Sequence, residues 1–440
     1  MTDVDLAAAG AAIVLALGGV AIAGIAMTRM VGDRVIAWLG ALVAAGAAVT
    51  VIADRSGTTE LGSGLTLDGA AAFFATLLAG VTAVSLVLTT AGPRTTRIRG
   101  DRVALVLFAA AGAAVAVAAS DLLALFAGLA LLSVPFSALE ARVDPPGAVR
   151  RFLLGAASLA IAAYGTALLY AATGETGYAA LGRATHNPLY LAGLGLVFAG
   201  LATRAMVASG RWSIVVTIGT VGALLRFVGA TRAGDVALDW EVSLAALAAA
   251  ALAVGALAAL TETRLRRSLG YATQVQLGFV LIAAAGFAAP AAAFALAVFA
   301  ALSVGAFGVV ALLPEDDPHL RDLGGLVRQR PFVAFALGIF VLGLVGLPPA
   351  AGFLARVYVL EAAVRGQLLW LVAAGALATV ASVAGFGRIV LACFAPPRLD
   401  AVAPQRARIG TVVLLALALA VVVVGVVPGP LLDAAQAVRF

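Results

Sequence analysis

The amino-acid sequence predicts an all-α polytopic membrane protein with about fourteen transmembrane helices. Of its 440 residues, 63% are hydrophobic and 11% are charged, and the mean hydropathy is +1.11. One water-soluble core of this composition would leave too little polar surface to meet water. The apolar residues also fall in runs long enough to cross about 30 Å of hydrocarbon. A soluble enzyme, a secreted disulfide-stabilised protein and a nucleic-acid-binding protein are therefore excluded.

The predicted helices coincide with the apolar windows. In chain order these are residues 5–27, 35–53, 69–90, 103–119, 122–139, 152–172, 189–209, 212–231, 241–260, 268–288, 290–313, 332–361, 367–394 and 409–430. The fourth and fifth windows meet at Ser120–Asp121, and the seventh and eighth at Ser209–Trp212, which predicts tight turns. The longest loop, Pro314–Arg330, is too short to fold as a separate domain. The first window follows an acidic segment without the basic start of a signal peptide, so we expect it to be retained.

The charged loops predict the orientation of the chain. All 28 basic residues are arginine. They gather in alternate loops, namely at Arg29, Arg34, Arg94, Arg97, Arg99, Arg102, Arg142, Arg150, Arg151, Arg211, Arg264, Arg266, Arg267, Arg321, Arg328, Arg330, Arg398, Arg406 and Arg408. The intervening loops hold fewer arginines and several acids. By the positive-inside rule the arginine-rich loops are cytoplasmic, and both termini lie outside.

No residue pattern in the chain predicts a catalytic, metal or cofactor site. Cys393 is the single cysteine, so no disulfide can form within the chain. His186 and His319, the two histidines, fall in loops on opposite sides of the membrane and cannot share a ligand. There is also no nucleotide-binding loop and no metal-ligand spacing. Any redox chemistry must therefore belong to a partner.

Charged residues within the predicted helices are the candidates for function, because a charge in hydrocarbon is costly. Arg204 and Arg356 have no acidic residue three or four positions away. Each arginine either contacts water or a partner from another helix, or extends along the helix to a lipid headgroup. Contact with a headgroup suits Arg204 better than Arg356, because Arg204 lies near a helix end. Arg226 and Arg388 are expected to extend to headgroups or to cap helices. Glu140 is expected to be a loop acid, with a proton relay as the alternative.

The twelfth window contains an interruption. Residues 346–353 include Pro348, Pro349 and Gly352 within an otherwise apolar run. Two prolines remove two backbone donors, so the helix must break or kink there. Broken backbone in a bilayer is tolerated where it is buried in protein or lines a wet cavity, as in the ion paths of transporters. Arg356 would lie close to such a path.

Four segments resemble one family, membrane subunit N of bacterial respiratory complex I. Residues 121–135 resemble its fifth helix, residues 150–174 its sixth helix and the following loop, and residues 266–271 the start of its tenth helix. The interruption with Arg356-Val357-Tyr358 resembles its broken twelfth helix. The similarity runs from about residue 100 to residue 395, and the helix number and chain length also fit.

The resemblance implies an architecture and a set of partners. It implies three N-terminal helices in residues 1–99, two inverted five-helix repeats in residues 100–232 and 233–395, and a last helix in residues 396–440. Each repeat of this proton-translocating family has a broken helix and a line of buried charges. The family lies in the bacterial plasma membrane beside other membrane-arm subunits and lipids. FMN, iron–sulfur clusters and quinone would belong to other subunits of such a complex.

Several positions depart from the pattern of the family. Ala130 stands at the position of the family's glutamate in helix five. Arg204, Thr217 and Arg356 stand at the positions of its lysines in helices seven, eight and twelve. Gln276 replaces its histidine in helix ten. The proline that breaks helix seven is replaced by Ala208-Ser209-Gly210. A buried lysine or histidine can release a proton, whereas arginine and glutamine do not near neutral pH.

Together these departures predict an N-type subunit with a structural role and with reduced or absent proton translocation. The alternative is a functional proton or cation translocator, either free-standing or associated with a hydrogenase-type complex. An unrelated small-molecule transporter is disfavoured by the resemblance.

Overall fold

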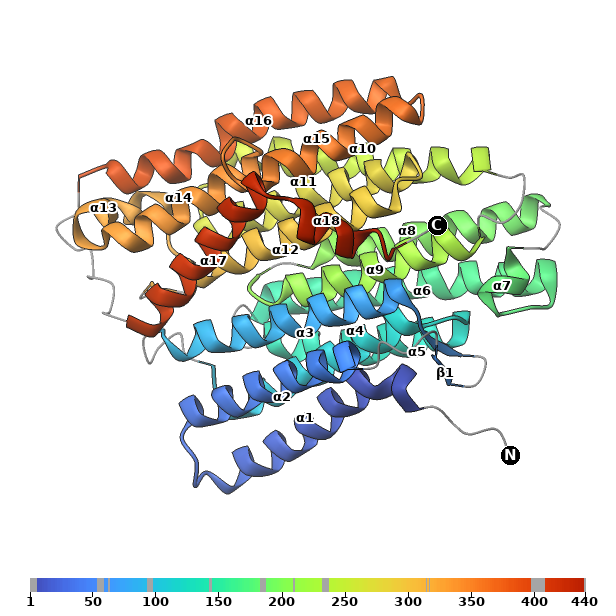
Figure 1. The fold of residues 1–440 in the computed structure, drawn as a ribbon, viewed down its shortest axis with the longest axis horizontal. Helices are drawn as coiled ribbons and strands as arrows, with labels where there is room; N and C mark the ends of the chain where they lie inside the picture. Colours follow the sequence, from blue (N-terminus) through green and yellow to red (C-terminus); the bar gives the residue numbers. More distant parts are fainter. Residues whose placement is uncertain are drawn as a thin grey trace.

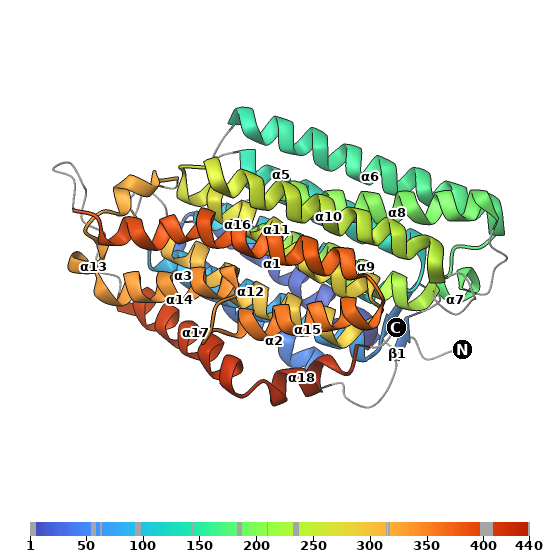
Figure 2. The same cartoon turned by 90° about the horizontal axis from the view of Figure 1, so that it is seen from above.

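The computed structural model describes residues 6–53, 59–61, 64–92, 98–141, 145–182, 187–208, 210–231, 237–313, 315, 317–396 and 408–438. The described chain is a bundle of long helices running between two ends (Figures 1 and 2). Thirteen of its helices are long and apolar enough to cross a membrane. This confirms the predicted fold class.

The thirteen long helices follow the predicted windows. They are α1 (Gly10–Thr28), α2 (Asp33–Ala53), α3 (Gly69–Thr90), α4 (Gly100–Ala118), α5 (Leu122–Ala141), α6 (Pro145–Thr173), α8 (Pro188–Val207), α9 (Ser213–Thr231), α10 (Ala237–Thr261), α11 (Leu265–Ala285), α12 (Ala289–Ala311), α16 (Leu369–Phe394) and α17 (Arg408–Val426). The twelfth predicted helix is two separate helices, α14 (Pro331–Val345) and α15 (Ala351–Arg365), which meet at the proline pair.

Short elements complete the fold. They are η1 (Leu6–Ala9), the hairpin of β1 (Thr59–Leu61) and β2 (Leu65–Leu67), α7 (Tyr178–Leu181), η2 (Leu320–Leu323), α13 (Leu326–Gln329) and α18 (Gly429–Ala435). The hairpin and α7 lie at one end of the bundle, and α13 lies at the other end (Figure 1). The described residues of the predicted arginine-rich loops belong to the α13 end. Arg94, Arg97, Arg142, Arg398 and Arg406 lie outside the described residues.

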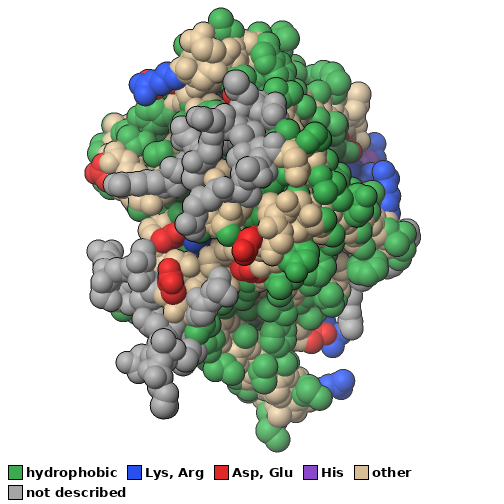
Figure 3. Space-filling view, turned by 90° about the vertical axis from the view of Figure 1, so that its right-hand side faces the viewer, with side chains coloured by type: hydrophobic (Ala, Val, Ile, Leu, Met, Phe, Trp, Pro, Cys, Tyr) green, Lys and Arg blue, Asp and Glu red, His purple; other side chains and the backbone are tan. Residues whose placement is uncertain are grey.

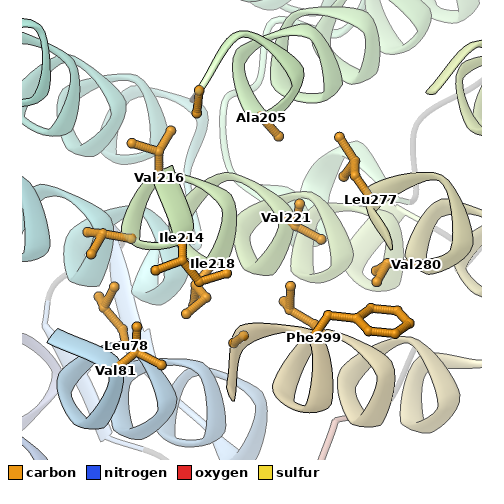
Figure 4. Packing of buried hydrophobic residues seen from close by; sticks show 14 of the residues in the cluster. Leu78, Val81, Ala205, Ile214, Val216, Ile218, Val221, Leu277, Val280 and Phe299 are labelled. Carbon is orange, nitrogen blue, oxygen red and sulfur yellow. The ribbon is translucent and has the colours of Figure 1, made fainter. Parts of the chain in front are cut away.

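The centre of the bundle is formed by α9, α11 and α12. In their most apolar windows, 83%, 89% and 94% of the residues are buried, against 28% for α1 and 22% for α17. Figure 4 shows α9 surrounded by side chains from α3, α8, α11 and α12. A helix that is apolar on all sides must be covered by other helices or by lipid. The inner helices are covered by protein, and the outer ones present large apolar side chains at the surface.

Among the described residues, few basic side chains lie at the hairpin end of the molecule. Viewed from that end, the surface carries several acidic groups near its middle, while the basic groups lie mostly at its edges (Figure 3). This asymmetry agrees with the alternation of charged loops in the sequence.

The link between α4 and α5 is held by an unusual pair of backbone contacts. The N–H of Leu122 donates to the carbonyl of Thr176 at 3.0 Å, and the N–H of Tyr178 donates to the carbonyl of Ser120 at 2.9 Å. The segment after α6 thus pairs with the α4–α5 link, and it then forms the short helix α7.

The same arrangement recurs between α10 and α11. The N–H of Leu265 donates to the carbonyl of Pro318 at 2.9 Å, and the N–H of Leu320 donates to the carbonyl of Thr263 at 2.8 Å. The short helix η2 follows, as α7 does in the first half. The two links are 143 residues apart (122 to 265) and lie at opposite ends of the bundle (Figure 1). The helices that follow, α8 and α14, begin at the same spacing (188 to 331).

Two arginines cap the C-terminal ends of α4 and α10. Arg226 in α9 donates to the carbonyl of Val117 in the last turn of α4 at 2.7 Å, to the carbonyl of Thr66 at 3.0 Å, and to Asp68 at 2.9 Å. The Asp68 carboxylate in turn accepts from a backbone N–H in the first turn of α3. A cation at a helix C-terminus satisfies free carbonyl groups and the helix dipole. The sequence left headgroup contact or capping open for Arg226, and the structure shows capping.

Arg388 in α16 does the same for α10. Its guanidinium donates to the carbonyl groups of Ala259 at 2.7 Å and Glu262 at 3.0 Å. Arg226 and Arg388 are 162 residues apart (226 to 388), which exceeds the 143-residue spacing by 19 residues. The additional residues lie between α14 and α16, where the chain forms α15. At the corresponding place between α8 and α9 there are only residues 208–212.

Replacing Arg226 with methionine should destabilise the protein by about 2 kcal/mol or more, because buried acceptors and one carboxylate lose a charged donor. The measurement is thermal unfolding of the purified protein in detergent. The control is Arg365→Met, since the Arg365 side chain is 78% exposed and pairs with Glu361 on the surface. Equal unfolding temperatures for the two variants would contradict the capping role.

Candidate functional site

The break between α14 and α15 removes the helical donors of the carbonyl groups before it, among them that of Leu344. Helix α14 ends in a left-handed residue, Gly346, with φ +83°, whose N–H returns to the carbonyls of Leu342 and Gly343. In a continuous helix the carbonyl of Leu344 would accept from residue 348. Residue 348 is proline and has no N–H.

Two side chains replace the missing donor. Arg356 donates through Nη2 to the Leu344 carbonyl at 2.6 Å, and Gln276 donates to the same oxygen through Nε2. Arg356 stands in the second turn of α15, just past the break, and Gln276 stands in the middle of α11. The break, the arginine and the glutamine, which were picked out separately in the sequence, therefore meet at one atom.

The remaining contacts of Arg356 are neutral. Its Nη1 donates to the hydroxyl of Thr379 in α16 at 2.7 Å, and its guanidinium carbon lies 4.4 Å from the ring centroid of Phe279 in α11. The residue is 4% exposed, and its Nε has no hydrogen-bond partner among the described residues. No carboxylate among those residues forms an ion pair with Arg356. We call Leu344, Arg356, Gln276, Thr379 and Phe279 the Leu344 cluster.

Two glycines allow the chain to pack tightly around this cluster. A Cβ atom on Gly352 would overlap the carbonyl oxygen of Gly343, so the first turn of α15 could not approach α14. A Cβ atom on Gly346 would overlap the side chain of Arg356, at a φ that side chains rarely adopt. Gly352, which the sequence assigned to the break, is therefore required by close contact.

Arg204 is buried in the other half of the molecule. It lies in the last turn of α8 with 3% of its surface exposed. Its Nε donates to the hydroxyl of Ser133 in α5 at 3.1 Å, and its guanidinium carbon is 5.5 Å from the ring centroid of Phe136. Its guanidinium also packs against Gly155 of α6. The headgroup interpretation for Arg204 is therefore wrong, because the side chain turns into the bundle.

The other predicted positions divide between the two halves. Thr217 is buried in α9, and its hydroxyl donates to the carbonyl of Ser213. Thr217 and Gln276 line the same small cavity. Ala130 lies in α5, three residues before Ser133 and away from the Leu344 cluster. Glu140 lies in the last turn of α5, and its side chain is outside the described part of the chain.

Sequence reasoning missed the groups that hold the two arginines. The Leu344 carbonyl could have been found, because Pro348 follows it by the four residues of one helical hydrogen bond. Thr379 and Ser133 carry no such signal, since they stand on other helices, α16 and α5, at no fixed spacing from the arginines they contact. Their roles depend on how the helices pack.

The geometry can be compared with known proteins. Residues 119–382 match the model of the family described as NADH:quinone oxidoreductase/Mrp antiporter, transmembrane. The chain belongs to this family. A relative from Geobacter metallireducens named NADH-quinone oxidoreductase subunit N is 30% identical, and the alignment covers all of both chains. Another of that name from Nitrosomonas europaea is 29% identical over 67% of this chain and 68% of the relative. The family resemblance seen in the sequence, to the antiporter-like membrane subunit N of complex I, is confirmed.

Solved structures share the fold of this family member. A chain of respiratory complex I from Thermus thermophilus with bound aureothin superposes with a TM-score of 0.84 at 26% identity, covering 96% of this chain and 98% of that one. A chain of the Mrp complex from Dietzia sp. DQ12-45-1b gives 0.81 at 20% identity, covering 100% and 97%. The second likeness shows the fold alone.

Thr379→Val should lower the stability of the protein by about 1–3 kcal/mol, because it leaves a donor of the buried Arg356 without an acceptor while keeping the side-chain shape. Thr82→Val is the matched control, since Thr82 is buried and its hydroxyl only donates to the Leu78 carbonyl of its own helix. Thermal unfolding of both variants checks the prediction. A Thr379→Val variant as stable as the control would show that Thr379 does not hold Arg356.

Proposed function

We propose that this chain is the N-type antiporter-like membrane subunit of a complex-I-like NADH–quinone oxidoreductase, and that its main role is structural. The observation that carries the proposal is that the short link between α8 and α9 leaves no room for a second half-helix. There, five residues (208 to 212) separate α8 from α9, whereas α15 and its flanking turns occupy the corresponding place in the second half.

The division into repeats supports this proposal. We propose that residues 100–232 and 233–395 are the two inverted repeats, preceded by three helices in residues 1–99 and followed by residues 396–440. The paired links after α4 and α10 and the arginine caps at Arg226 and Arg388 support these boundaries. On this division, the first repeat lacks the broken helix that the second repeat retains.

In the first repeat, no described group near Arg204 can exchange its charge with a proton. Among the described residues, Arg204 donates to the hydroxyl of Ser133, and Ala130 stands where the resemblance places a glutamate. Arginine stays protonated in proteins and cannot act as a relay. Helix α8 has 20 residues, about 30 Å, and spans the bilayer unbroken. Unbroken backbone gives water no free polar groups to follow, so we propose that this repeat does not conduct.

In the second repeat, the broken helix is present but its polar groups are engaged. Arg356 and Gln276 both donate to the Leu344 carbonyl, and neither gains or loses a proton near neutral pH. The cluster thus satisfies the break and fixes α14, α15, α11 and α16 to one another. These contacts are sufficient for a structural role of the second repeat.

One observation favours a second candidate function, a translocating subunit in complex I or in a free-standing or hydrogenase-type assembly. The Nε of Arg356 is buried without a partner among the described residues, next to an interrupted backbone. A fixed positive charge beside water could shape an ion path.

The host assembly would supply the redox groups. FMN, iron–sulfur clusters and quinone would be held by other subunits, because the relatives are named as the N subunit of an NADH-quinone oxidoreductase and the resemblance places the redox groups elsewhere in such a complex. The proposed site of action is the bacterial plasma membrane, with the arginine-rich α13 end on the cytoplasmic side and both termini outside. Lipids and neighbouring membrane-arm subunits would cover the apolar outer faces.

Tagged protein purified from native membranes in mild detergent should bring down flavin- and cluster-bearing subunits in stoichiometric amounts, identified by mass spectrometry. Such recovery is expected because the relatives are named as subunits of an NADH-quinone oxidoreductase. A tag on an unrelated polytopic protein from the same membranes is the control. Recovery of the chain alone or as a small homo-oligomer would overturn the complex-I assignment.

Arg356→Gln in the assembled complex should leave the number of protons pumped per NADH oxidised unchanged, because the proposed role of Arg356 is to satisfy the Leu344 carbonyl. Lower thermal stability of the complex is the expected effect. Arg365→Gln, an exposed arginine of the same helix, is the control. The measurement is proton uptake into proteoliposomes that contain the complex, recorded together with the rate of NADH oxidation. Reduced pumping with intact electron transfer would favour the translocating candidate.

A further inference from the structure

An open fissure enters the bundle at the hairpin end, between α2, α3 and α18. It is lined by the last turn of α2, the first turns of α3 and one face of α18. Its volume is about 750 Å³, which is within the range of about 300–1,000 Å³ for pockets that hold small molecules. Helix α18, which forms its outer side, lies at the edge of the bundle (Figures 1 and 2).

The burial of the lining residues shows that the fissure reaches from the surface to the centre of the bundle. At its rim, Ile52 of α2 is 44% exposed, and Ala434 of α18 is also exposed. At its floor, Leu67 of β2 and Ala297 of α12 are buried. Helix α12 belongs to the centre of the bundle. An occupant that reaches this floor must therefore lie between α3 and α18.

The wall of the fissure is apolar along most of its length. Phe73 and Leu77 of α3 face Leu431 of α18 across it, and only Asp68 and Thr76 among its lining residues are polar. Water does not fill a cavity of this character, whereas apolar molecules do. An empty cavity also loses the van der Waals contacts of its wall. The fissure therefore suits a hydrocarbon chain.

A transmembrane helix of another subunit is too wide to be the occupant. An α-helix with its side chains is about 10–12 Å across. The segment after α18 touches the start of α3, because a Cβ atom on Gly69 would lie 2.9 Å from the carbonyl oxygen of Ala437. This contact prevents a helix from passing between α3 and α18 to the floor. A hydrocarbon chain is only one methylene group wide and can pass.

Asp68 supplies the charged group of the fissure. Its side chain is 35% exposed, whereas that of Arg226, which pairs with it at 2.9 Å, is 8% exposed. The carboxylate accepts one hydrogen bond from Arg226 and one from the N–H of Ala71. A carboxylate has about four lone-pair sites, so Asp68 can accept further donors. An ammonium group complements this carboxylate, and an anionic group is repelled by it.

We propose that the fissure binds one phospholipid from the leaflet at the hairpin end. An acyl chain lies along the apolar wall between α3 and α18, and an ethanolamine headgroup donates to the carboxylate of Asp68. The lipid fills the space that separates α18 from α2, and so it fixes α18 to the bundle. This role is independent of whether the chain translocates protons.

The first test counts the lipids that the protein retains. The full-length protein, with any subunits that copurify, is prepared in mild detergent and weighed by native mass spectrometry. Ala434→Trp, which fills the rim of the fissure, should retain one phosphatidylethanolamine fewer than the wild type. The control is Ala376→Trp, which places the same side chain on an exposed position of α16, outside the fissure. Equal lipid counts in the two variants would overturn the proposal.

The second test separates the headgroup from the acyl chain. Phosphatidylethanolamine and phosphatidylglycerol with identical acyl chains are added back to delipidated protein. The wild type should bind the ethanolamine lipid about tenfold more tightly, because only that headgroup donates a charge-assisted hydrogen bond to Asp68. Asp68→Asn should reduce this preference, and a ratio measured within one variant is not altered by a general loss of stability. Equal affinities in the wild type would overturn the headgroup assignment, and a density map with a protein segment in the fissure would overturn the lipid.

Discussion

The need to satisfy one carbonyl oxygen inside the bilayer governs the second half of this protein. A backbone polar group left unpaired in hydrocarbon costs several kcal/mol, and proline at residue 348 removes the donor that the Leu344 carbonyl would otherwise receive. Arg356 of α15 and Gln276 of α11 donate hydrogen bonds to this carbonyl instead. Because the same guanidinium also holds Thr379, the broken helix becomes the point at which α11, α14, α15 and α16 are joined.

The first half meets the same requirement by avoiding the break. With only residues 208–212 between α8 and α9, there is no half-helix to satisfy, and α8 crosses as one piece. Helix α6 packs closely along α8: Gly165 of α6 lies against the backbone of Gly193 in α8, and Gly200 of α8 lies against Ala162 of α6. Small residues allow such close helix contacts within membranes.

Most of the fold could be predicted from the sequence, because membrane-spanning helices depend on local composition. The windows locate the long helices, and Pro348 with Pro349 locates the break. The burial of Arg204 could not be predicted, since Ser133 and Phe136 reach it from a helix about seventy residues away. The substitutions at Ala130 and Gln276 indicated altered chemistry, but they could not show that Gln276 would share an acceptor with Arg356. The β1–β2 hairpin and α7 were missed because they are too short to have a hydrophobic period.

Arginine suits both buried sites for the same physical reason, and that reason bears on function. Its five donors can engage several neutral acceptors in a fixed fork, whereas a lysine offers one flexible ammonium group. At residue 356 the fork reaches a carbonyl and a hydroxyl on separate helices, and it stacks on Phe279. A proton relay needs a group that is held loosely enough to change its charge and its partners. Arg356 meets neither condition, because it is permanently charged and its hydrogen bonds satisfy the broken backbone. The contacts that stabilise this break are therefore the ones that argue against conduction through it.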